Sequence, residues 1–176
     1  MPGIDLPILV SAWVAFVLWV TGEVVLAGRG GGGPSMRWGR RVWALGAAAL
    51  LLHVAMAFGR AHGWSHSVAV EATARQLQER MGISWGGGVF INYLLLAWWS
   101  WDAVAAWLCP NRWNMPGPVR SLRRAVFWFL WFNGAVVFAA GSRQAIAAVL
   151  CLGVLVRWRM SGHSRPSDRI PESHST

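Results

Sequence analysis

Five long apolar stretches, separated by short connections that contain arginine, dominate this 176-residue sequence. They cover approximately residues 4–27, 42–59, 89–108, 125–140 and 144–158. A helix that crosses a bilayer needs about 20 predominantly apolar residues, so these stretches have lengths suited to membrane spans. Charged residues make up 13% of the chain, against about 25% in an ordinary soluble domain. The sequence therefore predicts an all-α integral membrane helical bundle with about five transmembrane helices.

The expected domain organisation is simple. Residues 1–158 form a single transmembrane domain, because a chain of this length leaves no room for a separate soluble domain beside the spans. Residues 159–176 are rich in serine, proline and charge and contain little to bury. We expect them to form a disordered cytoplasmic tail.

The distribution of arginine predicts the orientation. All sixteen basic residues are arginines, and they are most frequent in the connections at 28–41 and 109–124 and in the last twenty residues. Basic connections remain in the cytoplasm, so we expect a bacterial-type inner-membrane protein with its N-terminus outside and its C-terminus inside. The arginines flank apolar stretches, which favours the lipid bilayer and other membrane proteins, or a second copy of the chain, as partners. Nucleic acid is not an expected partner.

Several classes of catalyst are excluded by residue content. The chain has no lysine, so it has neither a phosphate-loop lysine nor a Schiff-base lysine. The motifs G-x-S-x-G and H-E-x-x-H do not occur. Cys109 and Cys151 are isolated and are expected to be packing residues. We therefore predict no cofactor, with one alternative that concerns the histidines.

Residues 60–88 form the longest polar interruption of the apolar pattern. Ser65 to Met81 has helical periodicity, with Val70, Ala74 and Leu77 on one apolar stripe and charged residues opposite. Gly82 provides a stop signal. We predict an outer amphipathic helix, at about residues 65–81, that lies at the membrane interface.

Four residues form a candidate polar site at the outer face: His62, His66, Asn92 and Tyr93. Two histidines at positions i and i+4 of a helix can bind one divalent metal ion. A third ligand is missing, because Glu71 lies about 140° around the helix from His66. The favoured interpretation is that His62 and His66 bond to backbone or water, and the metal site is the alternative.

Four further polar residues lie within the apolar stretches, where each is a functional candidate by default. Glu23 and Asp102 both fall near the cytoplasmic ends of their spans, within reach of Arg29, Arg41 or Arg124. A charge pair that locks the helices together is the favoured interpretation, and a proton or cation site is the alternative. His53 and Asn133 fall near the midplane, where we expect a hydrogen bond between them.

The expected function is that of a non-enzymatic structural or accessory membrane component. Tryptophans of the third and fourth stretches would be lipid anchors or a partner surface: Trp98, Trp99, Trp101, Trp107, Trp128 and Trp131. The alternative is a small membrane enzyme or transporter with a histidine site at its outer face.

The orientation can be tested with a reporter that is active only outside the cytoplasm. A fusion after Met81 should be active, because residues 60–88 are expected outside, and a control fusion after Arg41 should be inactive. An inactive Met81 fusion in a stably expressed protein would overturn the assigned orientation.

Overall fold

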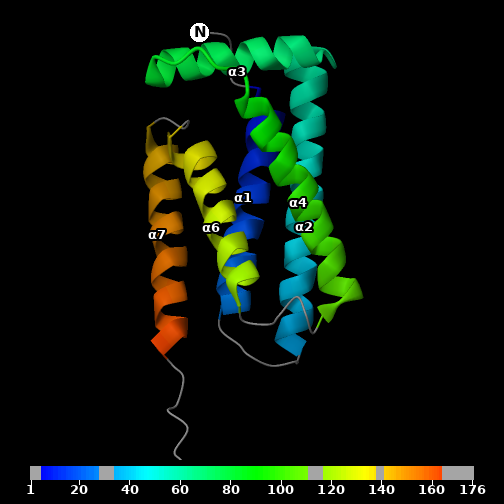
Figure 1. Cartoon of the computed structure of the whole chain (residues 1–176), viewed down its shortest axis with the longest axis vertical. Coiled ribbons are helices and arrows are strands. Elements are labelled where there is room, and N and C mark those ends of the chain that lie inside the picture. Colours follow the sequence, from blue (N-terminus) through cyan, green and yellow to red (C-terminus); the bar gives the residue numbers. More distant parts are fainter. Residues whose placement is uncertain (1–4, 28–33, 111–116, 138–140, 164–176) are drawn as a thin grey trace, which may run out of the picture.

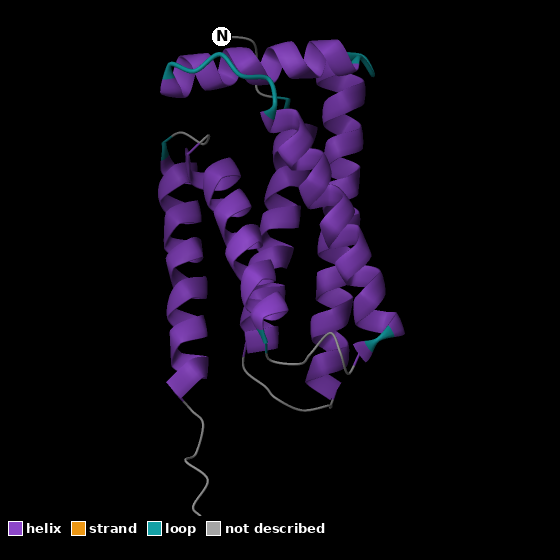
Figure 2. Ribbon diagram, in the orientation of Figure 1, coloured by secondary structure: helices purple, strands orange, loops and turns teal. Residues whose placement is uncertain are grey.

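Helices make up the regular structure of the described chain, which comprises residues 5–27, 34–110, 117–137 and 141–163 of a computed structural model (Figure 2). The helices are α1 (Leu6–Ala27), α2 (Pro34–Met56), α3 (His66–Met81), α4 (Gly88–Leu108), α6 (Pro118–Phe132) and α7 (Ser142–His163). Two π-helical turns, η1 (Ala57–Ala61) and η2 (Asn133–Val137), extend α2 and α6. These residues contain no strand, which confirms the predicted all-α class.

The five long helices run alternately up and down, and α3 lies across one end of them (Figure 1). We call this the cap end. The opposite end, where α2 and α6 begin and α7 finishes, is called the arginine end. Within the described ranges, three helices are long and apolar enough to cross a membrane, namely Leu6–Leu26, Pro34–Ala61 and Gly88–Leu108. The total of five spans stays a prediction.

Helices α2 and α6 begin earlier than their apolar stretches. They start at Pro34 and Pro118, whereas the apolar patterns begin at about residues 42 and 125. Proline suits the first helical turn because its fixed φ is helical and the missing N–H would have no partner there. Six arginines expected in flexible connections are therefore held on regular helix: Arg37, Arg40, Arg41, Arg120, Arg123 and Arg124. Helix α7 also continues to His163, so residues 159–163 are helical, and the rest of the expected tail, 164–176, lies outside the described residues.

Large aromatic side chains from four helices fill the centre of the bundle. Trp19, Trp43, Trp99, Phe16 and Phe127 are among its fully buried side chains. The rings of Trp43, Trp99 and Phe127 lie 5.3–5.4 Å apart, a spacing at which aromatic pairs attract beyond simple burial. This arrangement corrects the prediction that the tryptophans are surface anchors: Trp99 and Trp131 belong to the core, while Trp101 and Trp107 are exposed.

Gly46 allows α2 to pack closely against α4. A Cβ atom added at this position would lie 2.5 Å from the ring of the fully buried Trp99. Gly153 on α7 is the opposite case, because nothing lies within 4 Å of a Cβ built there.

The substitution Gly46→Ala should therefore lower the thermal unfolding midpoint of the detergent-purified protein. Overpacking of this kind costs about 1–3 kcal/mol. Gly153→Ala is the matched control and should leave the midpoint unchanged or raise it, since alanine favours helix. Equal midpoints for both variants would contradict the packing of Gly46 against Trp99.

Candidate functional site

Glu23 is the centre of the first polar cluster at the arginine end. Its side chain is buried in α1, with 2% of the residue exposed. Arg124 of α6 approaches it at 3.4 Å from Nε to Oε2, and the indole of Trp158 in α7 donates a 3.1 Å hydrogen bond to the same oxygen. The guanidinium of Arg124 also lies over the Trp158 ring, 5.3 Å from its centroid. One carboxylate thus joins three helices.

Asp102 is the centre of a second cluster with the same composition. Nη1 of Arg123 in α6 donates to both carboxylate oxygens, at 3.2 and 3.3 Å. Trp43 of α2 donates a 2.8 Å hydrogen bond to Oδ2, and the Arg123 guanidinium lies 5.6 Å from the centroid of the Trp43 ring. This cluster joins α4, α6 and α2.

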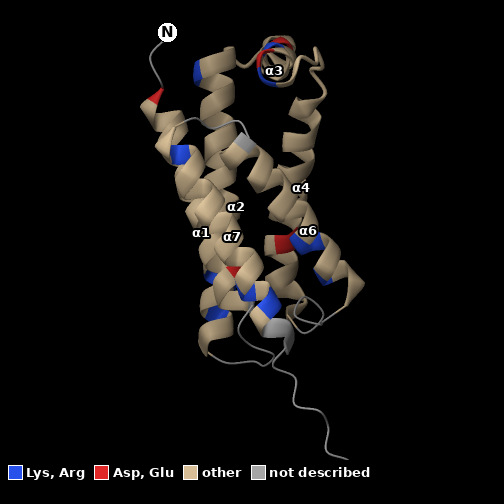
Figure 3. Cartoon of the chain, turned by 90° about the vertical axis from the view of Figure 1, so that its left-hand side faces the viewer, with Lys and Arg blue, Asp and Glu red and all other residues tan. Residues whose placement is uncertain are grey.

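Both clusters depend on adjacent residues of α6. Successive helical residues point about 100° apart, so Arg123 and Arg124 reach carboxylates on different helices. Figure 3 shows basic and acidic positions together on the long helices toward this end. Two more arginines link helices at the arginine end by donating hydrogen bonds to main-chain carbonyls near helix ends. Arg40 donates to Ala106 and Arg120 donates to Leu26.

Arg29, Arg41 and Arg124 were the predicted basic partners of Glu23 and Asp102. Of these, Arg124 forms an ion pair with Glu23. Arg29 lies outside the described residues, and Arg41 is exposed and lies against Trp38. Arg123 was missed by the sequence reasoning. It precedes Phe127 and Trp131 by four and eight residues, and all three are buried. That helical periodicity was the available signal, and it was overlooked because the residue was assigned to a connection.

His53 and Asn133 do not form the expected hydrogen bond. Nδ1 of His53 lies 3.1 Å from the carbonyl oxygen of Ile8 and 3.2 Å from the hydroxyl of Ser11, both on α1. Asn133 donates to the carbonyl of Phe129, one turn earlier in its own helix. Asn133 is thus satisfied within its own helix, and His53 is satisfied by α1.

A second polar region surrounds a cavity of about 660 Å³ at the cap end. Its walls come from α1, α2, α3, α4, α6 and the first turn of α7, and from both π-helical turns. Phe58 of η1 and Asn133 of η2 both line it. Single π-helical turns inside α-helices occur frequently at functional sites, and here two of them border one cavity.

The predicted outer-face residues lie around this cap-end cavity. His62, Asn92 and Tyr93 line it. His66 lies beside them, with Nδ1 3.0 Å from the Tyr93 hydroxyl and its ring against Phe90. Nδ1 of His62 is buried and makes no hydrogen bond with any described residue. The described chain contains no group of three or more His, Cys, Asp or Glu side chains placed to hold a metal ion.

The connection from α2 to α3 is tightly constrained. Gly63 and Trp64 both have positive φ, 54° and 60°, and the Trp64 ring packs over Gly59, which has no side chain. The Ser65 side chain then accepts a hydrogen bond from the Val68 amide and caps α3. These contacts position α3 across the end of the bundle.

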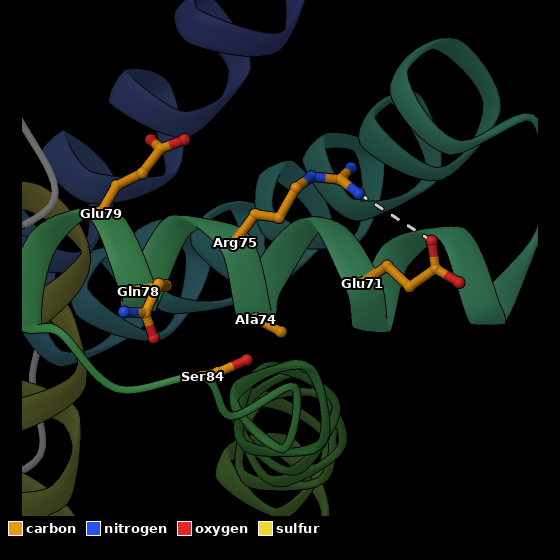
Figure 4. Close-up of a pocket in the computed structure, with 6 residues that line it drawn as sticks. All are labelled: Glu71, Ala74, Arg75, Gln78, Glu79 and Ser84. Carbon is orange, nitrogen blue, oxygen red and sulfur yellow. Dashed lines mark ion pairs between the residues drawn. The ribbon is translucent and has the colours of Figure 1, made fainter.

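The inner face of α3 differs from the predicted stripe. Val70 contacts Gly86, and Thr73 and Leu77 contact Gly88, so glycines at the start of α4 allow close approach. Ala74 belongs to the other side, where a shallow hollow contains Glu71, Arg75 and Ser84 (Figure 4). Glu71 and Arg75 are exposed and form an i,i+4 ion pair with a separation of 3.9 Å.

The chain matches no protein-family model, and comparisons with curated proteins and with solved structures find no match.

The Glu23–Arg124 pair can be tested with a double-mutant cycle. Arg124→Gln should destabilise the protein by about 3–5 kcal/mol, because it leaves a buried carboxylate without its counter-charge. Adding Glu23→Gln should recover part of this loss, which gives a large coupling free energy. The same cycle on Glu71 and Arg75 is the control and should give about 0.2–0.5 kcal/mol, as expected for an exposed helical pair. Both coupling free energies are measured by unfolding the variants in denaturing detergent. Equal coupling in the two cycles would contradict a structural role for the buried pair.

Proposed function

We propose that this chain is a multi-pass inner-membrane protein that acts as a non-enzymatic structural or accessory component. The spans are α1, α2 with η1, α4, α6 with η2, and α7, with the arginine end in the cytoplasm. The observation that supports this function best is the engagement of both buried carboxylates by α6. Glu23 and Asp102 are each ion-paired with an arginine and accept a hydrogen bond from a tryptophan.

The chemistry of these clusters favours helix association over transport. A carboxylate that binds and releases a cation or proton must exchange its partners during each cycle. Here the counter-charge comes from the protein, and the indole N–H groups satisfy further lone pairs. Removing one partner leaves an unpaired charge in an apolar environment, which is strongly unfavourable. The clusters are therefore suited to holding five helices in one arrangement.

The placement of arginines supports the proposed orientation. Arginines at the start of α2, at the start of α6 and in the last turns of α7 all belong to the arginine end. The cap end contains fewer: Arg60, Arg75, Arg80 and Arg143. Because basic residues are retained on the cytoplasmic side, this asymmetry favours a cytoplasmic arginine end and an external cap end.

A second function, a small membrane enzyme or transporter with a histidine site at the outer face, is favoured by one observation. His62, Asn92 and Tyr93 line one cavity, and the hydroxyl of Tyr93 is hydrogen-bonded to His66. A histidine with a hydrogen-bonded ring is the usual form of a metal ligand or proton-transfer group.

The two functions differ in what the purified protein should contain. We expect detergent-purified wild type and His66→Ala to be colourless and free of stoichiometric metal, by absorbance and elemental analysis, because the described residues place no group of three or more ligating side chains at this site. Stoichiometric metal in wild type that is lost in His66→Ala would contradict the accessory function and establish the histidine site. Tyr93→Phe provides a matched control, since it removes the hydrogen bond and keeps both histidines.

A further inference from the structure

We infer that the cap-end cavity binds a phospholipid with an anionic headgroup. The inference goes beyond the proposed function and rests on it only for the membrane setting. The cavity volume of about 660 Å³ falls within the range of about 300–1,000 Å³ that is usual for small-molecule sites. Its lining is divided between an apolar part and a basic, hydrogen-bonding part, which is the pattern of an amphiphile.

The apolar part lies between α1 and α6. Leu9, Trp13 and Phe16 follow one another at helical spacing on α1, and Phe129 and Leu130 contribute from α6. An inorganic anion would leave these side chains in contact with water. A hydrocarbon chain would cover them, because burial of apolar surface is favourable in proportion to its area.

The basic part comes from two arginines on different helices. Arg80 in the last turn of α3 and Arg143 in the first turn of α7 both line the cavity. Neither arginine forms an ion pair within the described chain, and the cavity lining includes no Asp or Glu. The site therefore has net positive charge and calls for an anion.

Two polar atoms of other lining residues are also without partners among the described residues. Nδ1 of His62 and Nε1 of Trp131 are buried and unsatisfied, and Trp131 is only 8% exposed. The amides of Gln76 and Asn92 line the same cavity. A buried polar atom without a partner is costly, and the ester and phosphate oxygens of a phospholipid would supply acceptors. Phosphate also suits two arginines better than a single carboxylate does, because it offers more oxygens for charge-assisted hydrogen bonds.

The test uses the purified full-length chain in detergent, with phosphatidylglycerol and phosphatidylcholine of identical acyl chains as probes. Bound lipid is counted by native mass spectrometry, and brominated chains report contact by quenching tryptophan fluorescence. Wild type should retain one phosphatidylglycerol in preference to phosphatidylcholine. Arg80→Gln combined with Arg143→Gln should weaken this binding by about tenfold or more, as expected when charge-assisted hydrogen bonds are lost. Arg75→Gln is the control on the same helix and should bind like wild type.

A second pair of variants tests the apolar part. Ala12 lies on the cavity face of α1, so Ala12→Phe should reduce binding and quenching while the exposed Val17→Phe should not. Equal retention of both lipids, or equal binding by the arginine double variant and Arg75→Gln, would overturn the inference. Oleate that binds as tightly as phosphatidylglycerol would show that the phosphate headgroup is not recognised. Inorganic phosphate that binds equally would overturn the role of the acyl chain.

Discussion

The pairing of two buried carboxylates with adjacent arginines of α6 is the interaction on which this fold depends. Glu23 and Asp102 belong to helices that each pack well with α2 through apolar side chains, whereas α6 begins with Arg120, Arg123 and Arg124. Without the carboxylates, this turn of α6 would place unpaired charge against the aromatic core. With them, the same charges attach α6 to α1 and α4. Burying each charge is unfavourable unless it is paired, so the arrangement of helices that pairs these charges is favoured over others.

The two ends of the bundle differ in how their polar groups are used. At the arginine end the charged groups are largely matched with one another or with helix carbonyls. At the cap end, Arg80 and Arg143 face a cavity without an acidic residue in its lining. Rigid and matched groups suit structural support, and groups that lack partners suit binding. A scaffold at one end and a ligand site at the other are compatible roles for one small protein.

The sequence predicted the helical class, the cap helix and the level of Glu23 and Asp102 because each depends on local pattern. Apolar runs, helical periodicity and a terminal glycine at Gly82 are all short-range signals. Which arginine meets which carboxylate is a long-range property, and it required knowing that Pro118 starts a helix. The cavity could not be predicted for the same reason: His62, Asn92 and Arg143 come together only through packing. The partner of His53 could not be predicted either. The atom nearest to its Nδ1 is the main-chain carbonyl oxygen of Ile8, and every residue has such a carbonyl, so residue types do not identify it.

The position of the two carboxylates in the chain also has a consequence for biogenesis. Glu23 and Asp102 both precede α6, so they have been synthesised before Arg123 and Arg124 leave the ribosome. Three arginines in its first turns make α6 a poor candidate for independent insertion into lipid. Once α1 and α4 are in place, their acids offer α6 a prepared docking position. The order of helices along the chain therefore provides a route of assembly in which the arginine-bearing helix α6 joins the bundle after its counter-ions.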